Sequence, residues 1–182
     1  MNTIKTFVIA AAVAAFTLPL TAQQKRISPH ETGSTVIEGS RVTITYGRPY
    51  SKDPKTGEIR KIWGGLVPFG KVWRAGADEA TTLITEKPLV FGTLTVPAGA
   101  YSLYMLPEEN GQSQLIISKE VGQWGMTYHQ DQDLGRVDLK REEVPNRADQ
   151  LIITTEKNPA GGGTLVILWS NMQYSAPFTV QK

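Results

Sequence analysis

The chain has no cysteine among its 182 residues. This absence excludes disulfides, thiolate metal sites, cysteine nucleophiles and any lipid attached through a cysteine. The chain also lacks a surplus of either charge, because 19 Lys and Arg residues face 17 Asp and Glu residues and leave a formal net charge of +2 at pH 7. Nucleic-acid binding usually requires a clustered basic face, so we expect no nucleic-acid partner.

Only one extended apolar run is present, and it lies near the N-terminus. Residues 1–22 are typical of a secretory signal peptide, with Lys5 in the positive region, an apolar segment at 7–16 and the small residue Ala22 at the end. The apolar segment is well short of the ~20 residues that span a bilayer, which disfavours an uncleaved anchor. We therefore expect cleavage before Gln23 and a soluble exported protein, periplasmic or secreted, with no membrane span after cleavage.

A sustained helical stripe of apolar residues is also missing. Short segments of period-two alternation are present instead, as where Val42, Ile44 and Tyr46 alternate with threonines. Residues 164–169 are apolar on both faces, which predicts a central strand covered from both sides. The predicted strands are 42–46, 89–91, 94–96, 101–106, 114–118, 136–140, 150–155, 164–169 and 178–180. We expect an all-β fold, with residues 23–182 forming a single antiparallel β-sandwich or open, jelly-roll-like barrel.

Residues 62–82 fit neither a strand nor an ordinary loop. They contain Trp63, Phe69, Trp73 and four glycines in irregular sequence. Aromatic residues in a loop need a surface to pack against, and long irregular loops in compact domains are usually functional. The segment is therefore predicted to be a long aromatic and glycine-rich loop that forms part of a site.

The same segment resembles the signature of the domain-of-unknown-function 2911 family, a group of exported bacterial proteins. The matching runs are residues 64–74, 76–77, 79–81, 97–103, 123–125 and 136–137, together with Tyr46, Arg48 and Pro49. The resemblance covers nearly all of the mature chain and implies a β-rich fold without an established activity. Asp78 stands where the family pattern has Asn, and His129 where it has a carboxylate, so both departures weaken family-based roles at these positions.

Arg74 is the leading candidate for ligand binding. A guanidinium group beside Trp73 could hold a carboxylate, phosphate or sulfate through two hydrogen bonds, with Glu79 orienting it. The other candidate binding residues are Arg48 as a second anion grip, Trp124 as an apolar wall, and Tyr101. The structural alternative, which we slightly favour and which does not exclude binding, is an internal Arg74–Glu79 ion pair that would hold the irregular loop against the sandwich, with the aromatic residues filling its open end.

His129, Asp131 and Asp133 form a second cluster. Their alternate spacing would place the imidazole and two carboxylates on one side of an extended segment, where they could hold a divalent metal ion. The alternative, which we favour, is a solvated polar turn before the strand that begins near Arg136, because short isolated motifs often arise by chance. We thus expect no cofactor, with a divalent metal as the weaker hypothesis.

No recognisable nucleophile motif accompanies these residues. The chain lacks both the Gly-x-Ser-x-Gly elbow and the His-Glu-x-x-His pair. We therefore favour a non-catalytic binding module for a small anionic or sugar ligand, or for a component of the cell envelope. A periplasmic hydrolase, perhaps assisted by a metal, and a structural module that docks another envelope protein are the two alternatives.

Overall fold

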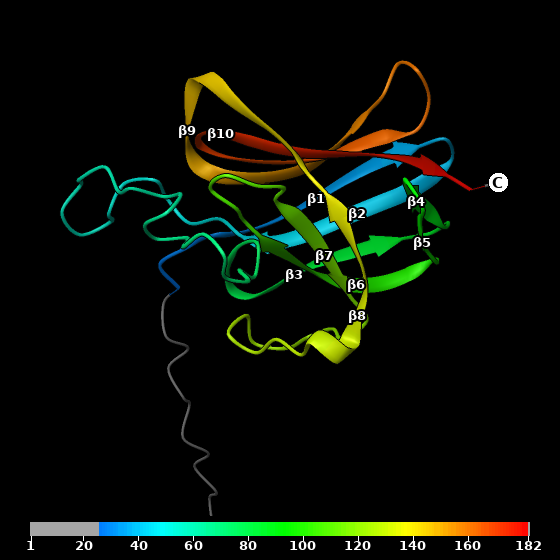
Figure 1. Ribbon diagram of the computed structural model, residues 1–182, viewed down its shortest axis with the longest axis horizontal. Helices are drawn as coiled ribbons and strands as arrows, with labels where there is room; N and C mark the ends of the chain where they lie inside the picture. The colour runs from blue at the N-terminus through cyan, green and yellow to red at the C-terminus, as the bar shows by residue number, and fades with distance from the viewer. Residues whose placement is uncertain (1–25, 182) are drawn as a thin grey trace, which may run out of the picture.

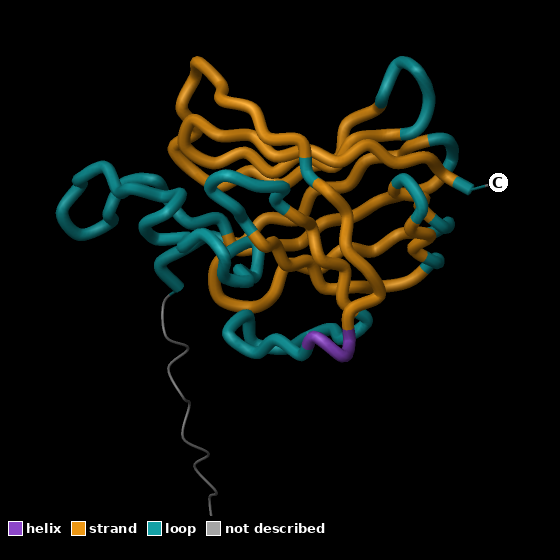
Figure 2. Tube along the Cα trace, in the orientation of Figure 1, coloured by secondary structure: helices purple, strands orange, loops and turns teal. Residues whose placement is uncertain are grey.

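The computed structural model describes residues 26–181, so the predicted signal peptide at residues 1–22 lies outside it. Two antiparallel sheets face each other as an open β-sandwich (Figure 1). The 3-10 turn η1 (Gln130–Gln132) is the one helical element in the described part of the chain (Figure 2). The predicted all-β fold is confirmed, and the sheets remain open rather than closing into a barrel.

The larger sheet has six strands in the order β1-β2-β3-β6-β7-β8. Their bounds are β1 (His30–Ile37), β2 (Ser40–Gly47), β3 (Ala77–Thr85), β6 (Gly99–Leu106), β7 (Gln114–Ser118) and β8 (Asp133–Asp138). In β2, Val42, Ile44 and Tyr46 are buried whereas Arg41 is exposed, which confirms the predicted alternation. This alternation turns one face of the sheet towards the core.

The smaller sheet has four strands in the order β5-β4-β10-β9. Their bounds are β4 (Leu89–Phe91), β5 (Leu94–Val96), β9 (Lys140–Lys157) and β10 (Gly163–Val180). β10 lies between β4 and β9, as its apolar N-terminal half predicts. The segment predicted as a separate strand at 178–180 is the end of this same long strand.

Two strands are not predicted from the sequence. β1 alternates polar and small residues, so its period-two signal is weak, and only its last residue is buried. β3 overlaps the end of segment 62–82, whose sequence predicts an irregular loop throughout. That segment is irregular only up to Gly76, and it continues as β3 between β2 and β6.

The connection from β2 to β3, residues 48–76, is the irregular part of the molecule. It extends from one end of the sandwich, at the left of Figure 1 in cyan and teal. Trp63 and Trp73 from this connection contact Trp169 of β10, which joins the connection to the smaller sheet. No helix in residues 26–181 is long and apolar enough to cross a membrane.

Candidate functional site

Three tryptophans form a cluster at the candidate site, and two of them, Trp73 and Trp169, line it. Trp73 stacks on Trp169 with ring centroids 5.9 Å apart, and it meets the edge of Trp63 at 5.8 Å. The indole nitrogen of Trp63 donates a hydrogen bond to the Trp169 carbonyl at 3.2 Å. Offset and edge-on contacts of this kind stabilise aromatic clusters beyond the area they bury. The cluster thus fixes residues 63–73 against β10.

A cleft of about 320 Å³ opens beside this cluster. Its wall combines apolar residues from the β2–β3 connection and from the segment before β1 with polar side chains. The residues that determine its chemistry are Tyr50, Arg60, Trp73, Arg74, Asp78 and Trp169. We call this feature the Arg74 cleft. Its volume is at the lower end of the range of ~300–1,000 Å³ typical of small-molecule sites.

Four residues that line the Arg74 cleft each carry a buried polar atom with no hydrogen-bond partner in the described residues. The atoms are Nε of Arg60, Nε of Arg74, Oδ2 of Asp78 and Nε1 of Trp169. Buried polar groups in folded proteins are nearly always paired, and an orphaned one costs about 1–3 kcal/mol. Asp78 Oδ2 also lies 3.9 Å from Nε2 of His30, at the outer limit of an ion pair. Three donors and one acceptor without a hydrogen bond thus belong to residues of one cleft, an arrangement that a polar ligand could satisfy.

Arg74 is held by packing rather than by a carboxylate. Its Cδ lies so close to the Gly125 backbone that a Cβ on residue 125 would come within 1.9 Å of it. Its Nη1 atom donates to the sulfur of Met126 at 3.1 Å. Burial lowers the pKa of the Arg74 guanidinium, and the nearby Asp78 carboxylate opposes this shift. Arg74 thus carries a partly desolvated charge that no ion pair neutralises.

The backbone around Arg74 is strained. Ala75 and Asp78 adopt φ angles of 50° and 65°, in the left-handed region that costs residues with a Cβ roughly 1–2 kcal/mol. The Thr81 hydroxyl donates to the Ala75 carbonyl at 2.8 Å and helps to hold this conformation. Such strain is concentrated at binding and catalytic sites, where the surrounding structure holds side chains in functional positions.

Glu79 does not orient Arg74, so that prediction is wrong. Its carboxylate pairs with Arg26 and accepts a hydrogen bond from Nε2 of His30 at 3.0 Å. Burial disfavours its charge, but its own backbone N–H, Arg26 and His30 outweigh burial and lower the pKa of Glu79. Glu79 therefore anchors the segment before β1, and the predicted structural pair with Arg74 is likewise absent.

The other predicted binding residues lie outside the cleft. Arg48 pairs with Glu31, and its Nε donates to the Leu151 carbonyl at 3.0 Å. Tyr101 is buried, with its hydroxyl donating to the Pro97 carbonyl. Trp124 lies on the surface with 53% of its area exposed. Of the predicted binding residues, the structure brings only Trp73 and Arg74 to the cleft.

Three polar residues of the cleft were not predicted as a group. No motif around Arg60 indicates a binding residue. Trp169 lies in an apolar segment that is typical of a core strand. Asp78 is close to Arg74 in the chain, but its left-handed backbone was not visible in the sequence. A complete prediction of the cleft would have required knowing that β10 runs beneath the β2–β3 connection.

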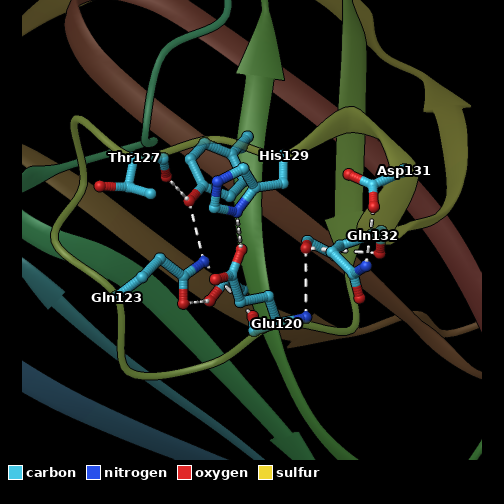
Figure 3. Close-up of polar contacts among 9 residues, drawn as sticks. Glu120, Gln123, Thr127, His129, Asp131 and Gln132 are labelled. Atoms are coloured by element: carbon cyan, nitrogen blue, oxygen red, sulfur yellow. Dashed lines mark hydrogen bonds and ion pairs between the residues drawn. The ribbon is translucent and has the colours of Figure 1, made fainter.

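The candidate metal residues do not come together. Nδ1 of His129 lies 2.9 Å from a carboxylate oxygen of Glu120, whereas Asp131 contacts Gln132 (Figure 3). Asp133 instead accepts hydrogen bonds from Tyr128 and Arg136. The segment is the turn η1 rather than an extended strand, which separates the three side chains. No group of three His, Asp or Glu residues able to hold a metal occurs in residues 26–181.

Two hydrogen-bonded pairs form around this turn instead. The Glu120 carboxylate raises the pKa of His129 through a hydrogen bond and through its charge. Burial, together with the hydrogen bond to the Asp133 carboxylate, raises the pKa of Tyr128 to about 12. Pairing with Glu120 thus accounts for the shift of His129, and burial with pairing to Asp133 for that of Tyr128.

Comparison with known proteins gives one match. A family model described as "Protein of unknown function (DUF2911)" matches residues 28–178, from just before β1 into the last residues of β10. This match confirms the resemblance based on the motifs in the β2–β3 connection. Neither the curated proteins nor the solved structures gave a match.

Proposed function

The chain belongs to the DUF2911 family, and we propose that it is an exported binding protein that takes a small anionic ligand into the Arg74 cleft. One observation supports this proposal: four residues that line a single cleft, Arg60, Arg74, Asp78 and Trp169, each carry a buried polar atom without a hydrogen bond. A ligand that pairs with these atoms would remove the cost of leaving them unsatisfied.

The lining specifies the chemistry of the ligand. Arg74 and Trp169 are donors, so they require an acceptor such as a carboxylate, whereas Asp78 requires a hydroxyl or ammonium donor. Trp73 and Leu66 offer apolar surface to the remainder of the molecule. The proposed ligand is therefore a small carboxylate that also carries a hydroxyl or amino group, such as a hydroxy acid, a sugar acid or an amino acid.

The lining supports binding rather than chemistry. Ser28 lines the cleft, but a serine nucleophile needs an adjacent base, and the cleft is lined by neither histidine nor lysine. The metal-assisted hydrolase was based on His129, Asp131 and Asp133, whose side chains pair with different partners. The lining of the Arg74 cleft therefore contains neither a serine with an adjacent base nor the residues of the metal-assisted hydrolase.

Calorimetric titration of the mature protein, residues 23–182, tests this proposal. The probes are acetate, glycine, glutamate and gluconate, and tryptophan fluorescence of a Trp124→Phe variant provides a second readout that removes the exposed indole. We expect at least one hydroxylated or aminated probe to bind more tightly than acetate. Arg74→Met should weaken that binding tenfold or more, since charge-assisted hydrogen bonds contribute about 1.5–3 kcal/mol.

The matched control is Arg41→Gln, because Arg41 is exposed, pairs with Glu86 and is not part of the cleft. This variant should bind every probe as the wild type does. Asp78→Asn should selectively weaken ammonium-bearing probes, because an amide retains an acceptor but loses the negative charge. The proposal fails if no probe binds, or if Arg74→Met and Arg41→Gln bind equally well.

A further inference from the structure

We propose a second binding site, for phosphate or a phosphate monoester, in a cleft adjoining the Arg74 cleft and independent of its function. This second cleft has a volume of about 550 Å³. The lining residues that bear on its chemistry are Arg60, Lys61, Arg141, Arg147, Ser170 and Asn171. We call it the Arg147 cleft, and Arg60 lines both clefts.

The pairing of arginines across the molecule first points to this cleft. In residues 26–181, Arg26, Arg41, Arg48 and Arg136 each form an ion pair with a carboxylate. The arginines of this range that form no ion pair are Arg60, Arg74, Arg141 and Arg147, and every one of them lines one of the two clefts. Uncompensated guanidinium groups are thus concentrated in one region of the molecule.

The charge balance of the Arg147 cleft is strongly positive. Its lining contains three arginines and Lys61, against Glu109 as its one carboxylate. Glu109 contacts Arg141 through its backbone carbonyl, so this contact leaves the guanidinium charge uncompensated. A formal net charge of only +2 for the whole chain makes this local excess more notable. The cleft therefore attracts anions without the molecule being basic overall.

Arg141 is fixed in place before any ligand binds. Its Nη1 donates to the Glu109 carbonyl at 2.9 Å, and its guanidinium lies 5.8 Å from the centre of the Phe69 ring. Its Nε faces the Met172 sulfur at 3.4 Å. Arg60, which also lines the cleft, donates to the Tyr50 carbonyl and keeps a buried Nε without a partner. Binding here requires little reordering of these side chains, which favours affinity.

A large bulge in the smaller sheet contributes residues to the lining. Ser170 pairs with Ala148, but Met172 pairs with Glu143, so residues 144–147 of β9 oppose Asn171 alone. Arg147 lies at the end of this bulge, and Ser170 adopts a left-handed φ of 58°. Bulges that redirect side chains, and strained residues other than glycine, are both typical of functional sites. Ser170 and Asn171 both line the cleft, where the Ser170 hydroxyl donates to the Asn171 side-chain oxygen at 3.4 Å and the Asn171 amide donates to Glu143 at 2.7 Å.

This donor set fits phosphate better than it fits a single carboxylate. Guanidinium groups bind phosphate oxygens through two parallel hydrogen bonds, and a phosphate monoester carries close to two negative charges near neutral pH. Three arginines and Lys61 around one opening can share those charges and oxygens. The same chemistry is offered by free inorganic phosphate and by the phosphate monoester head group of a lipid.

Calorimetric titration of residues 23–182 with inorganic phosphate and with pyrophosphate tests the site. Arg147→Gln is the main variant, because Arg147 is exposed and its loss leaves no described carboxylate unpaired. We expect Arg147→Gln to weaken phosphate binding about tenfold, as loss of one charge-assisted contact implies. Arg41→Gln is the matched control and should leave phosphate affinity unchanged. Equal affinities of Arg147→Gln and the wild type, or no binding of either anion by the wild type, would overturn the proposal.

Vesicle sedimentation distinguishes the two sources of phosphate. Phosphatidylcholine vesicles with and without phosphatidic acid are mixed with wild type and with Arg147→Gln. Sedimentation that requires both phosphatidic acid and Arg147 supports a lipid head group, whereas binding of free phosphate alone supports the soluble anion. Sedimentation that Arg147→Gln does not reduce contradicts the site.

The two proposals can fail separately. Arg74→Met removes a residue that lines only the Arg74 cleft, so it should leave phosphate binding intact. Arg147→Gln should leave binding of the carboxylate probes intact for the same reason. Arg60 lines both clefts and is therefore not used to separate them.

Discussion

Arg74 should be dispensable for stability although the proposed function requires it. Its guanidinium is partly desolvated and has no ion pair, so replacing it with methionine removes an uncompensated charge while keeping an unbranched chain against Gly125. We expect the free energy of unfolding of Arg74→Met to be unchanged or about 1 kcal/mol higher than that of the wild type, as for many residues kept for function. Urea denaturation of residues 23–182 measures this difference.

Arg48→Met provides the comparison for Arg74→Met. Arg48 pairs with Glu31 and donates to the Leu151 carbonyl, so its loss leaves two acceptors without their partner. We expect this variant to lose about 1–3 kcal/mol of stability. A loss of 3–5 kcal/mol in Arg74→Met instead would show a buried structural pair, and would contradict the role proposed for Arg74.

The sequence identified Trp73 and Arg74 but not their partners. An aromatic residue and an arginine in a glycine-rich loop need buried surroundings, and this requirement is visible in the sequence alone. Which carboxylate faces which guanidinium depends on the direction of each side chain. Glu79 lies in β3 and its carboxylate meets His30 of β1 and Arg26, away from Arg74. Proximity in the sequence therefore predicts an Arg74–Glu79 pair, whereas in the structure Glu79 pairs with residues before and in β1.

At the scale of elements, Glu79 ties the segment before β1 to β3. Ile27 and Ser28 of that segment line the Arg74 cleft, so this ionic contact helps to form one wall of the site. The folded-state pKa of Glu79 is lower than its ordinary value of 4.5. Its contribution to stability is therefore fully present above pH 4.5, and it is lost as pH falls through the folded-state pKa.

Glu79→Gln should remove this pH dependence. We expect the wild type to be more stable than Glu79→Gln at neutral pH, with a difference that narrows below pH 4.5 as Glu79 becomes protonated. The difference will be modest, because the ion pair is partly exposed. Urea denaturation of both proteins between pH 3 and 7, about the range over which a carboxylate of this kind titrates, measures it. A difference that does not change with pH would show that Glu79 acts through packing and not through its charge.

Strands were predictable where burial alternates and not where polar residues dominate. β2 and the first half of β10 carry strong apolar signals, whereas β1 is mostly polar and small and lies at the edge of its sheet. β3 is not predicted because it follows directly after the irregular connection, without a turn signal between them. The bulge opposite Asn171 depends on the register between β9 and β10, and register is a property of the pair rather than of either strand.

At the scale of the whole molecule, stability comes from the core between the sheets without any disulfide. The interior contains buried aromatic and branched residues from both sheets, with Trp169, Tyr174 and Leu103 almost completely enclosed. A cysteine-free core of this kind is insensitive to the redox state of the compartment. The fold therefore depends on neither an oxidising nor a reducing compartment.

If the protein is exported as proposed, signal-peptide cleavage determines the first residue of the mature chain. Cleavage must leave the residues that form the Arg74 cleft in place. Cleavage before Gln23 retains Arg26, Ile27, Ser28 and His30, which contact Glu79 or line the Arg74 cleft. We expect the mass of the protein recovered from the periplasm or culture medium to correspond to residues 23–182. Ala11→Asp should block processing, because a charge interrupts the apolar segment that the export machinery recognises.

A mature N-terminus beyond Ser28 would contradict the cleft, because it would remove Ile27, Ser28 and the Arg26–Glu79 ion pair. Full-length protein retained inside the cell would contradict export and leave the cleft as the site of an intracellular ligand. The Glu79→Gln variant is the control, since it weakens the same wall without altering residues 1–25. If Glu79→Gln is processed normally but loses carboxylate binding, the segment before β1 contributes to the ligand site and not to export.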